Sequence, residues 1–439
     1  MALAARVAFA VASFVVNRTI LVPDEAQYLE LSQTVANGHT ADSWFPLRGE
    51  TFYRSTFAYT GLLRFLYALL PDSRIVAQLV SATFGAATAA VTALIVRCRF
   101  SRRAALLSGL VVALVPSQIL WSSVALREGE VWLSLACLTL AAVLASRGDG
   151  RSLLGAAALT AGSLLVLGAL RDQTLVAAAW AFGLTIVLLP GPSRLLRMVG
   201  GLAIVVALPI VGGTGPGGWT LVQRAVPALG STRTNLAVNA ETAFTPTTIL
   251  GREEEPVPRT GTGGGATSTT APTAATTTTT SPVPGGDVHV FTRNGTTYAA
   301  DDSIEGSISE LPRGLVATLF RPFPWEATDG FQVLLAKVEN VVWFALYAVA
   351  LLGAWRGRRL LDVLLYPFLT FGMVIGIAAV SQGNLGTAFR HRGQVLWALA
   401  VLAAPVFERW WGGREEDVDL LLAEADLAGM AELDAAHQG

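Results

Sequence analysis

The chain carries little charge for its length. Charged residues make up 14% of its 439 residues, hydrophobic residues make up 52%, and the mean hydropathy is +0.52. A soluble globular protein has a larger fraction of charged residues and a smaller fraction of apolar residues. The composition therefore predicts an all-α protein that crosses a membrane several times. The formal net charge of −1 gives no reason to expect a nucleic-acid partner.

Cysteine and lysine are also scarce. Cys98 and Cys137 offer neither a disulfide framework nor a metal-binding spacing. The basic residues are nearly all arginine, with Lys337 as the visible exception, and no glycine-rich, lysine-bearing phosphate loop is present. These absences argue against a soluble nucleotide donor, and we expect no cofactor. A divalent metal at an acidic pair is the less favoured alternative.

Ten apolar segments are long enough to cross a bilayer as helices. They lie near residues 3–21, 75–96, 104–121, 130–146, 153–170, 174–190, 195–212, 334–354, 360–380 and 393–410. We interpret the first as a retained spanning helix rather than a signal peptide. The stretch from Phe57 to Leu70 is short and contains Arg64, which favours a helix lying in the membrane interface.

Arginine placement predicts the orientation of these spans. Short loops at 97–103, 147–151, 194–197 and 356–359 all fall on one side, which the positive-inside rule assigns to the cytoplasm. The remaining charged clusters then fall on the outer side. The sequence therefore predicts an N-terminal module at 1–212 with a first outer loop at 22–72, an outer segment at 213–333, a C-terminal module at 334–411 and an acidic cytoplasmic tail at 412–439.

The outer segment is composite. Residues 256–286 are almost entirely Thr, Gly, Pro and Ser, a composition that predicts disorder. After it, alternating residues from Asp287 to Tyr298 around Asn294-Gly295 predict a short hairpin.

The first outer loop begins with Pro23-Asp24-Glu25-Ala26-Gln27-Tyr28. If a helix starts at Pro23, Asp24 and Tyr28 share one of its faces. The two carboxylates either cap this helix at the interface or take part in chemistry.

A second cluster, residues 381–392, lies between two apolar segments on the outer side and contains Asn384, Arg390, His391 and Arg392. Its glycines, arginines and histidine suit a phosphate, whereas a simple positive anchor belongs on the cytoplasmic side. Other outer-side cations are Arg127, Arg171 and Arg321. Arg127-Glu128 and Arg171-Asp172 are either self-neutralising pairs at helix ends or parts of the same phosphate site.

The Asp24-Glu25-x-x-Tyr28 pattern and the order of elements after it resemble the GT-C membrane glycosyltransferases, in particular the protein O-mannosyltransferase and lipid A aminoarabinose transferase group. The resemblance covers roughly residues 1–210. It implies an enzyme of a bacterial plasma membrane that transfers a sugar from a polyprenyl-phosphate donor to an acceptor outside the cytoplasm.

The resemblance implies that Asp24 is the catalytic base or its close assistant, with Glu25 beside it. From the charge pattern we expect Tyr28, Arg127, Arg171, Arg321, Asn384, Arg390, His391 and Arg392 to bind substrate or phosphate. The expected reaction is an inverting single displacement. Two alternatives stay open: a polysaccharide polymerase or ligase with a diphosphate-linked donor, and a transporter of lipid-linked sugars.

Overall fold

The protein is predominantly helical. The structure, a computed structural model, describes residues 1–16, 23–44, 52–53, 56–189, 194–211, 288–293, 296–301, 311–326, 331–381 and 390–412. The Thr-rich stretch at 256–286, Asn384, and the acidic tail after Gly412 lie outside these described residues.

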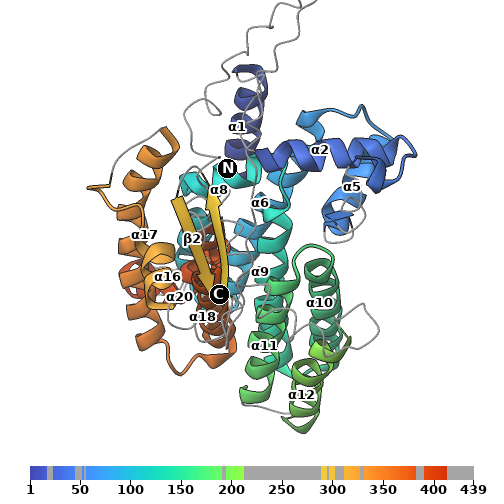
Figure 1. Cartoon of the computed structure of the whole chain (residues 1–439). Coiled ribbons are helices and arrows are strands. Elements are labelled where there is room, and N and C mark those ends of the chain that lie inside the picture. Colours follow the sequence, from blue (N-terminus) through green and yellow to red (C-terminus); the bar gives the residue numbers. More distant parts are fainter. Residues whose placement is uncertain are drawn as a thin grey trace, which may run out of the picture.

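The N-terminal part starts with an apolar helix and a helix that lies across the bundle. α1 runs from Ala2 to Val16, and α2 runs from Pro23 to Ala36. Pro23 is thus the first helical residue, as expected from its missing N–H group. Figure 1 shows α2 running sideways past the ends of α1 and α6, with α5 (Phe57–Tyr67) below it. The short α3 (Ala41–Trp44) follows α2.

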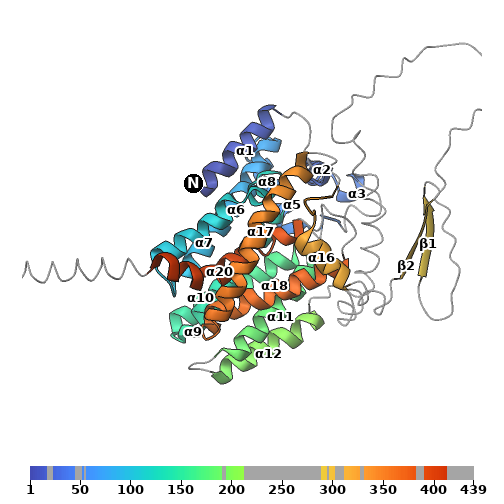
Figure 2. The same ribbon diagram turned by 90° about the vertical axis from the view of Figure 1, so that its left-hand side faces the viewer.

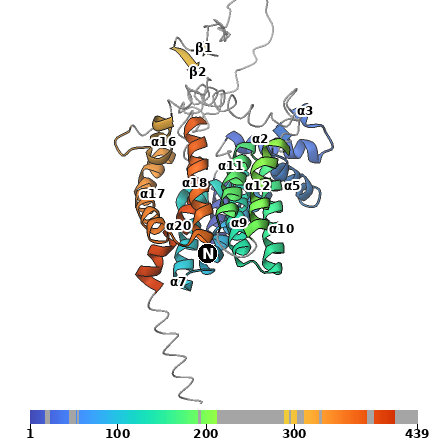
Figure 3. The ribbon, with the colours of Figure 1, turned by 90° about the horizontal axis from the view of Figure 1, so that it is seen from below.

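Most of the remaining helices form the bundle itself. They are α6 (Arg74–Arg97), α7 (Arg102–Leu114), α8 (Pro116–Ser123), α9 (Glu128–Arg147), α10 (Gly150–Gly168), α11 (Asp172–Leu188), α12 (Arg194–Val211), α17 (Phe331–Arg356), α18 (Leu361–Ser381) and α20 (Leu396–Phe407). A π-helical turn, η1 (Glu408–Gly412), follows α20. Figure 3 shows α17 and α12 on opposite flanks of this bundle.

In the part of the chain that the structure describes, five helices are long and apolar enough to cross a membrane, namely α6, α9, α10, α17 and α18, and the bent pair of α7 and α8 would make a sixth. The chain is a membrane protein on this evidence of length and composition. The segment expected as one span at 104–121 is instead two helices that meet at an angle of 58°. Pro116 causes the break, since it has no N–H group to continue the hydrogen-bond ladder of α7.

A hairpin of two strands and one helix are described in the segment expected as an outer loop. Strands β1 (Val288–Arg293) and β2 (Thr296–Asp301) pair antiparallel with Arg293 opposite Thr296, which confirms the predicted hairpin. Helix α16 (Leu311–Phe320) packs against α18.

Charged turns gather at the two ends of the bundle. At one end Arg99 pairs with Asp362, and the amide of Ser101 donates to Glu408. At the other end Arg74 pairs with Glu25, and Arg390 pairs with Asp24. Figure 2 shows the corresponding separation, with α7 near one end and α2 near the other. The division of charge predicted from the sequence thus corresponds to two physical ends of the molecule.

Candidate functional site

Asp24 and Arg390 form the centre of the candidate site, although 366 residues separate them in the chain. Arg390 Nη1 lies 2.6 Å from Asp24 Oδ2. Asp24 stands in the first turn of α2, where the positive end of the helix dipole favours a carboxylate. Its side chain is 43% exposed, so the carboxylate is paired and still accessible from outside the protein.

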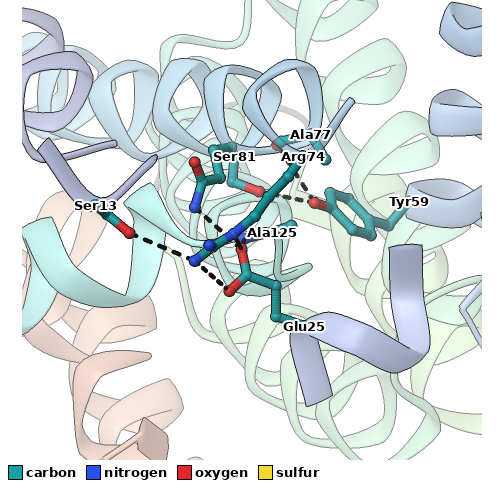
Figure 4. Close-up of polar contacts among 8 residues, drawn as sticks. Ser13, Glu25, Tyr59, Arg74, Ala77, Ser81 and Ala125 are labelled. Carbon is teal, nitrogen blue, oxygen red and sulfur yellow. Dashed lines mark hydrogen bonds and ion pairs between the residues drawn. The ribbon is translucent and has the colours of Figure 1, made fainter. Parts of the chain in front are cut away.

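The neighbouring carboxylate of Glu25 is fully buried. Its Oε1 accepts from Arg74 Nε at 3.0 Å, from Gln78 Nε2 at 3.1 Å and from the amide of Ala125 at 3.1 Å. Its Oε2 accepts from Arg74 Nη2 at 3.1 Å. Figure 4 shows this carboxylate among donors from α6 and from the segment after α8. Glu25 therefore joins α2 to α6 and holds the first turn of α2, while Asp24 faces the arginines.

Two arginines of the site lie over aromatic rings. The guanidinium of Arg390 is 5.0 Å from the centre of the Trp121 ring, and that of Arg127 is 5.9 Å from the centre of the Tyr28 ring. Tyr28 is itself packed against Phe52 and Tyr59. An aromatic ring contacts the flat face of a guanidinium and leaves the N–H groups at its edge directed elsewhere, where they can meet an oxyanion.

Arg171 completes the cluster from the start of α11. Its Nη2 lies 2.8 Å from Glu128 Oε1. Arg127 Nη1 donates to the carbonyl of Leu170, the residue before Arg171. Glu128 is thus paired with Arg171, and this pair joins α9 to the start of α11.

Burial and neighbouring charges change the pKa values in this cluster. Burial lowers the pKa of Arg171, with Glu128 acting in the opposite direction. Burial also lowers that of Arg390, but Asp24 and Glu128 more than offset this, so the pKa of Arg390 is raised. Burial raises the pKa of Tyr28, which excludes its phenolate as a base near neutral pH.

His391 contributes no charge to the cluster. Burial, followed by repulsion from Arg171, Arg390 and Arg127, lowers its pKa to about 3. The sequence interpretation counted this histidine as a source of positive charge; in the structure it is neutral at physiological pH.

Arg392 and Arg321 lie apart from the Asp24 carboxylate. Arg392 is fully buried, donates to the carbonyl of Leu319 at 3.0 Å and lies 4.8 Å from the centre of the Trp343 ring. Arg321 pairs with Glu326 at 2.8 Å. Both arginines hold the end of α16 and the segment after it, so we exclude them from the cluster. Asn384 lies outside the described residues.

Two residues that the sequence analysis did not single out also belong to this region. Trp121 supports Arg390, and Glu130, two residues after Glu128, is buried close enough to Arg127 to interact with it electrostatically. Neither has a sequence signal of its own, because Trp121 sits inside an apolar segment and Glu130 follows two other charged residues.

The described part of the cluster contains buried donors without a partner. Within the described residues, Arg171 Nη1 and Arg390 Nε have no hydrogen-bond partner, and Glu128 Oε2 also lacks one. A buried charged donor without an acceptor is costly, and an oxyanion such as a phosphate is the ligand that satisfies several arginine N–H groups together. In the same described ranges, no three His, Cys, Asp or Glu residues lie close enough to hold a metal ion.

Comparisons of the chain with protein-family models, with curated proteins and with solved structures find no match.

Proposed function

We propose that the chain is an integral membrane glycosyltransferase that moves a sugar from a polyprenyl-phosphate donor to an acceptor hydroxyl on the outer side of the membrane. The observation that carries the proposal is the pairing of an accessible carboxylate, Asp24, with Arg390, next to a second buried arginine, Arg171, that interacts electrostatically with Arg390. The helical, apolar body of the protein supports a lipid-linked donor over a soluble one.

The proposed reaction is an inverting single displacement. Asp24 takes the proton of the acceptor hydroxyl, and the acceptor oxygen attacks the anomeric carbon of the sugar. The bond from that carbon to the phosphate oxygen breaks, and its electron pair goes to the phosphate. Arg390 and Arg171 stabilise the departing phosphate, and Arg127 adds positive charge beside them.

The proposed topology has ten crossings. Besides the helices long enough to span alone, it includes α1, the bent pair α7–α8, α11, α12 and α20, which are shorter or broken. The end of the bundle that carries Asp24 would face away from the cytoplasm, because the opposite end carries the short arginine-rich turns of 97–103, 147–151 and 356–359.

Asp24→Asn tests the proposal in proteoliposomes. Turnover of polyprenyl-phosphate hexoses and pentoses, measured as release of polyprenyl phosphate, should fall at least about a hundred-fold, because a general base contributes roughly that much. Glu30→Gln is the matched control, since Glu30 lies on the same helix and its carboxylate accepts a hydrogen bond from Trp44.

Wild-type turnover by Asp24→Asn would refute the role of Asp24. Turnover with a diphosphate-linked donor alone would identify a polymerase or ligase, and movement of the donor across the membrane without release of its phosphate would identify a transporter.

A further inference from the structure

Helix α8 connects several parts of the candidate site. The ring of its Trp121 lies under the guanidinium of Arg390. Its Gln118 Nε2 donates to the carbonyl of Gly393, three residues after Arg390, at 2.9 Å. The segment that follows α8 donates the amide of Ala125 to Glu25. The direction of α8 therefore sets the position of Trp121 beside Arg390 and the position of the Ala125 amide that bonds to Glu25, the neighbour of Asp24.

The direction of α8 depends on the break at Pro116, which frees backbone groups on each side. Pro116 has no N–H group for the carbonyl of Val112, and the amide of Ser117 turns away from the carbonyl of Ala113. Freed backbone groups in an apolar body are costly unless another group bonds to them.

Arg6 of α1 bonds to the freed carbonyls. Its Nη2 donates to Val112 at 3.1 Å, its Nη1 donates to Ala113 at 3.0 Å, and its Nε donates to Ser122 Oγ of α8 at 2.8 Å. The side chain is fully buried. One guanidinium thus bonds to the end of α7 and to α8 together, and its charge suits the negative end of the α7 dipole.

Glu339 of α17 bonds to the freed amide. Its Oε2 accepts from the amide of Ser117 at 2.7 Å, and its Oε1 accepts from Ser117 Oγ and from Trp343 Nε1 at 2.7 Å. Glu339 is buried, and its charge suits the positive end of the α8 dipole. Its carboxylate therefore caps the N-terminus of α8, although Glu339 belongs to a helix more than two hundred residues later in the chain.

We propose that Arg6 and Glu339 are positioning residues for the candidate site: together they cap the two sides of the helix break and hold Trp121 under Arg390. The effect of these two residues on catalysis rests on the proposed function. Within the described ranges, neither Arg6 nor Glu339 forms a hydrogen bond or ion pair with Asp24 or the arginine cluster, so both act through α8.

The chain offers matched controls for both residues. Glu408 Oε2 accepts the amide of Ser101, next to the start of α7, at 2.8 Å, which is the same kind of contact at the opposite end of the bundle. Arg197 is a buried arginine whose Nη2 donates to the carbonyl of Leu189 at the end of α11. Substitution of either control removes a comparable contact away from α8.

The test uses the full chain in nanodiscs, labelled with 5-fluorotryptophan, with the fluorine resonance of Trp121 identified by Trp121→Phe. Arg6→Gln and Glu339→Gln should each shift or broaden the Trp121 resonance, whereas Arg197→Gln and Glu408→Gln should leave it unchanged. In the same samples the dissociation constant of farnesyl phosphate should rise at least about tenfold for the first pair only, because small displacements of binding groups have effects of this size or larger.

An unchanged Trp121 resonance in both Arg6→Gln and Glu339→Gln would overturn the positioning role. If one of these two variants does not fold, the other decides the outcome. Failure of the wild-type protein to bind farnesyl phosphate would instead refute the proposed function, and the fluorine comparison would still decide whether Arg6 and Glu339 hold Trp121.

Discussion

Asp24 and Glu25 are adjacent in the sequence, yet their carboxylates lie in different surroundings. Asp24 has one arginine partner and is 43% exposed, whereas Glu25 accepts four hydrogen bonds and is fully buried. The first arrangement suits a group that exchanges a proton with a substrate. The second suits a group that holds a helix in place.

Glu25→Gln should therefore reduce stability more than Asp24→Asn. Loss of the Glu25 charge leaves Arg74 paired with a neutral side chain in a mostly buried site, which costs about 3 kcal/mol. Asp24→Asn removes a more exposed pair and should cost about 1 kcal/mol or less. Thermal unfolding of both variants in detergent measures the difference, and equal losses would contradict the anchoring role of Glu25.

His391 should make stability depend on pH. Its pKa is about 3 in the folded protein, below the ordinary value of 6.5, so as the pH falls from 6.5 towards 3 the unfolded chain binds a proton that the folded chain does not. The stabilising contribution is thus complete above 6.5 and is lost progressively below it, by roughly 1–2 kcal/mol at a pH of about 5.

His391→Gln should reduce this loss when the thermal midpoint is followed from neutral to acidic pH. His39→Gln, at an exposed position after α2, is the control and should keep the wild-type pH dependence. The same loss in His391→Gln as in the wild type would show that another group causes it.

At the scale of elements, local signals predicted the site helix correctly. Pro23 followed by two carboxylates predicts the start of α2, and Gly38, with a φ of 81°, stands just after the last residue of this helix, Ala36. The hairpin at 288–301 follows equally from its turn residues. In each case the residues that predict the element lie within a few positions of the helix end or turn that they determine.

The break between α7 and α8 shows where local signals are insufficient. Pro116 lies inside the span expected at 104–121, but the side chains that bond to the backbone groups freed at the 58° bend, Arg6 and Glu339, come from α1 and α17. Both partners are distant in the chain. The Arg171–Glu128 pair was not predicted for the same reason, since its two residues lie 43 positions apart in the chain.

Gly85 of α6 gives α8 the space that this arrangement needs. A Cβ atom at this position would lie 2.4 Å from Ser122 Cβ and 2.8 Å from Arg6 Nε. Gly85→Ala should therefore displace α8 or Arg6 and destabilise the protein by about 1–3 kcal/mol.

Gly162→Ala in α10 is the matched control, because a Cβ atom there meets nothing within 4 Å. Alanine at that position should leave stability unchanged or increase it by up to about 1 kcal/mol, since alanine favours a helix more than glycine does. Thermal unfolding compares the two variants, and an unaffected Gly85→Ala would contradict the close packing of α6 and α8.

At the scale of the whole molecule, charge is sorted between two ends of a helical bundle. The sequence predicted this sorting from the placement of arginines alone, because alternating spans bring every second turn to the same side. It could not predict which arginines meet Asp24. Arg390 pairs with Asp24 and Arg171 pairs with Glu128 at the start of α9, whereas Arg392 and Arg321 are directed to α16 and the segment after it.

A density map of the full chain in nanodiscs that contain polyprenyl phosphate tests the central claim most directly. The account predicts phosphate density within hydrogen-bond distance of Arg390 Nε and of Arg171 Nη1, two buried donors of the candidate site that lack a hydrogen-bond partner among the described residues. The apolar chain of the lipid should lead into the bilayer. The density should disappear in Arg390→Gln. Phosphate density only at the opposite end of the bundle, near the arginines of 97–103, would contradict the account.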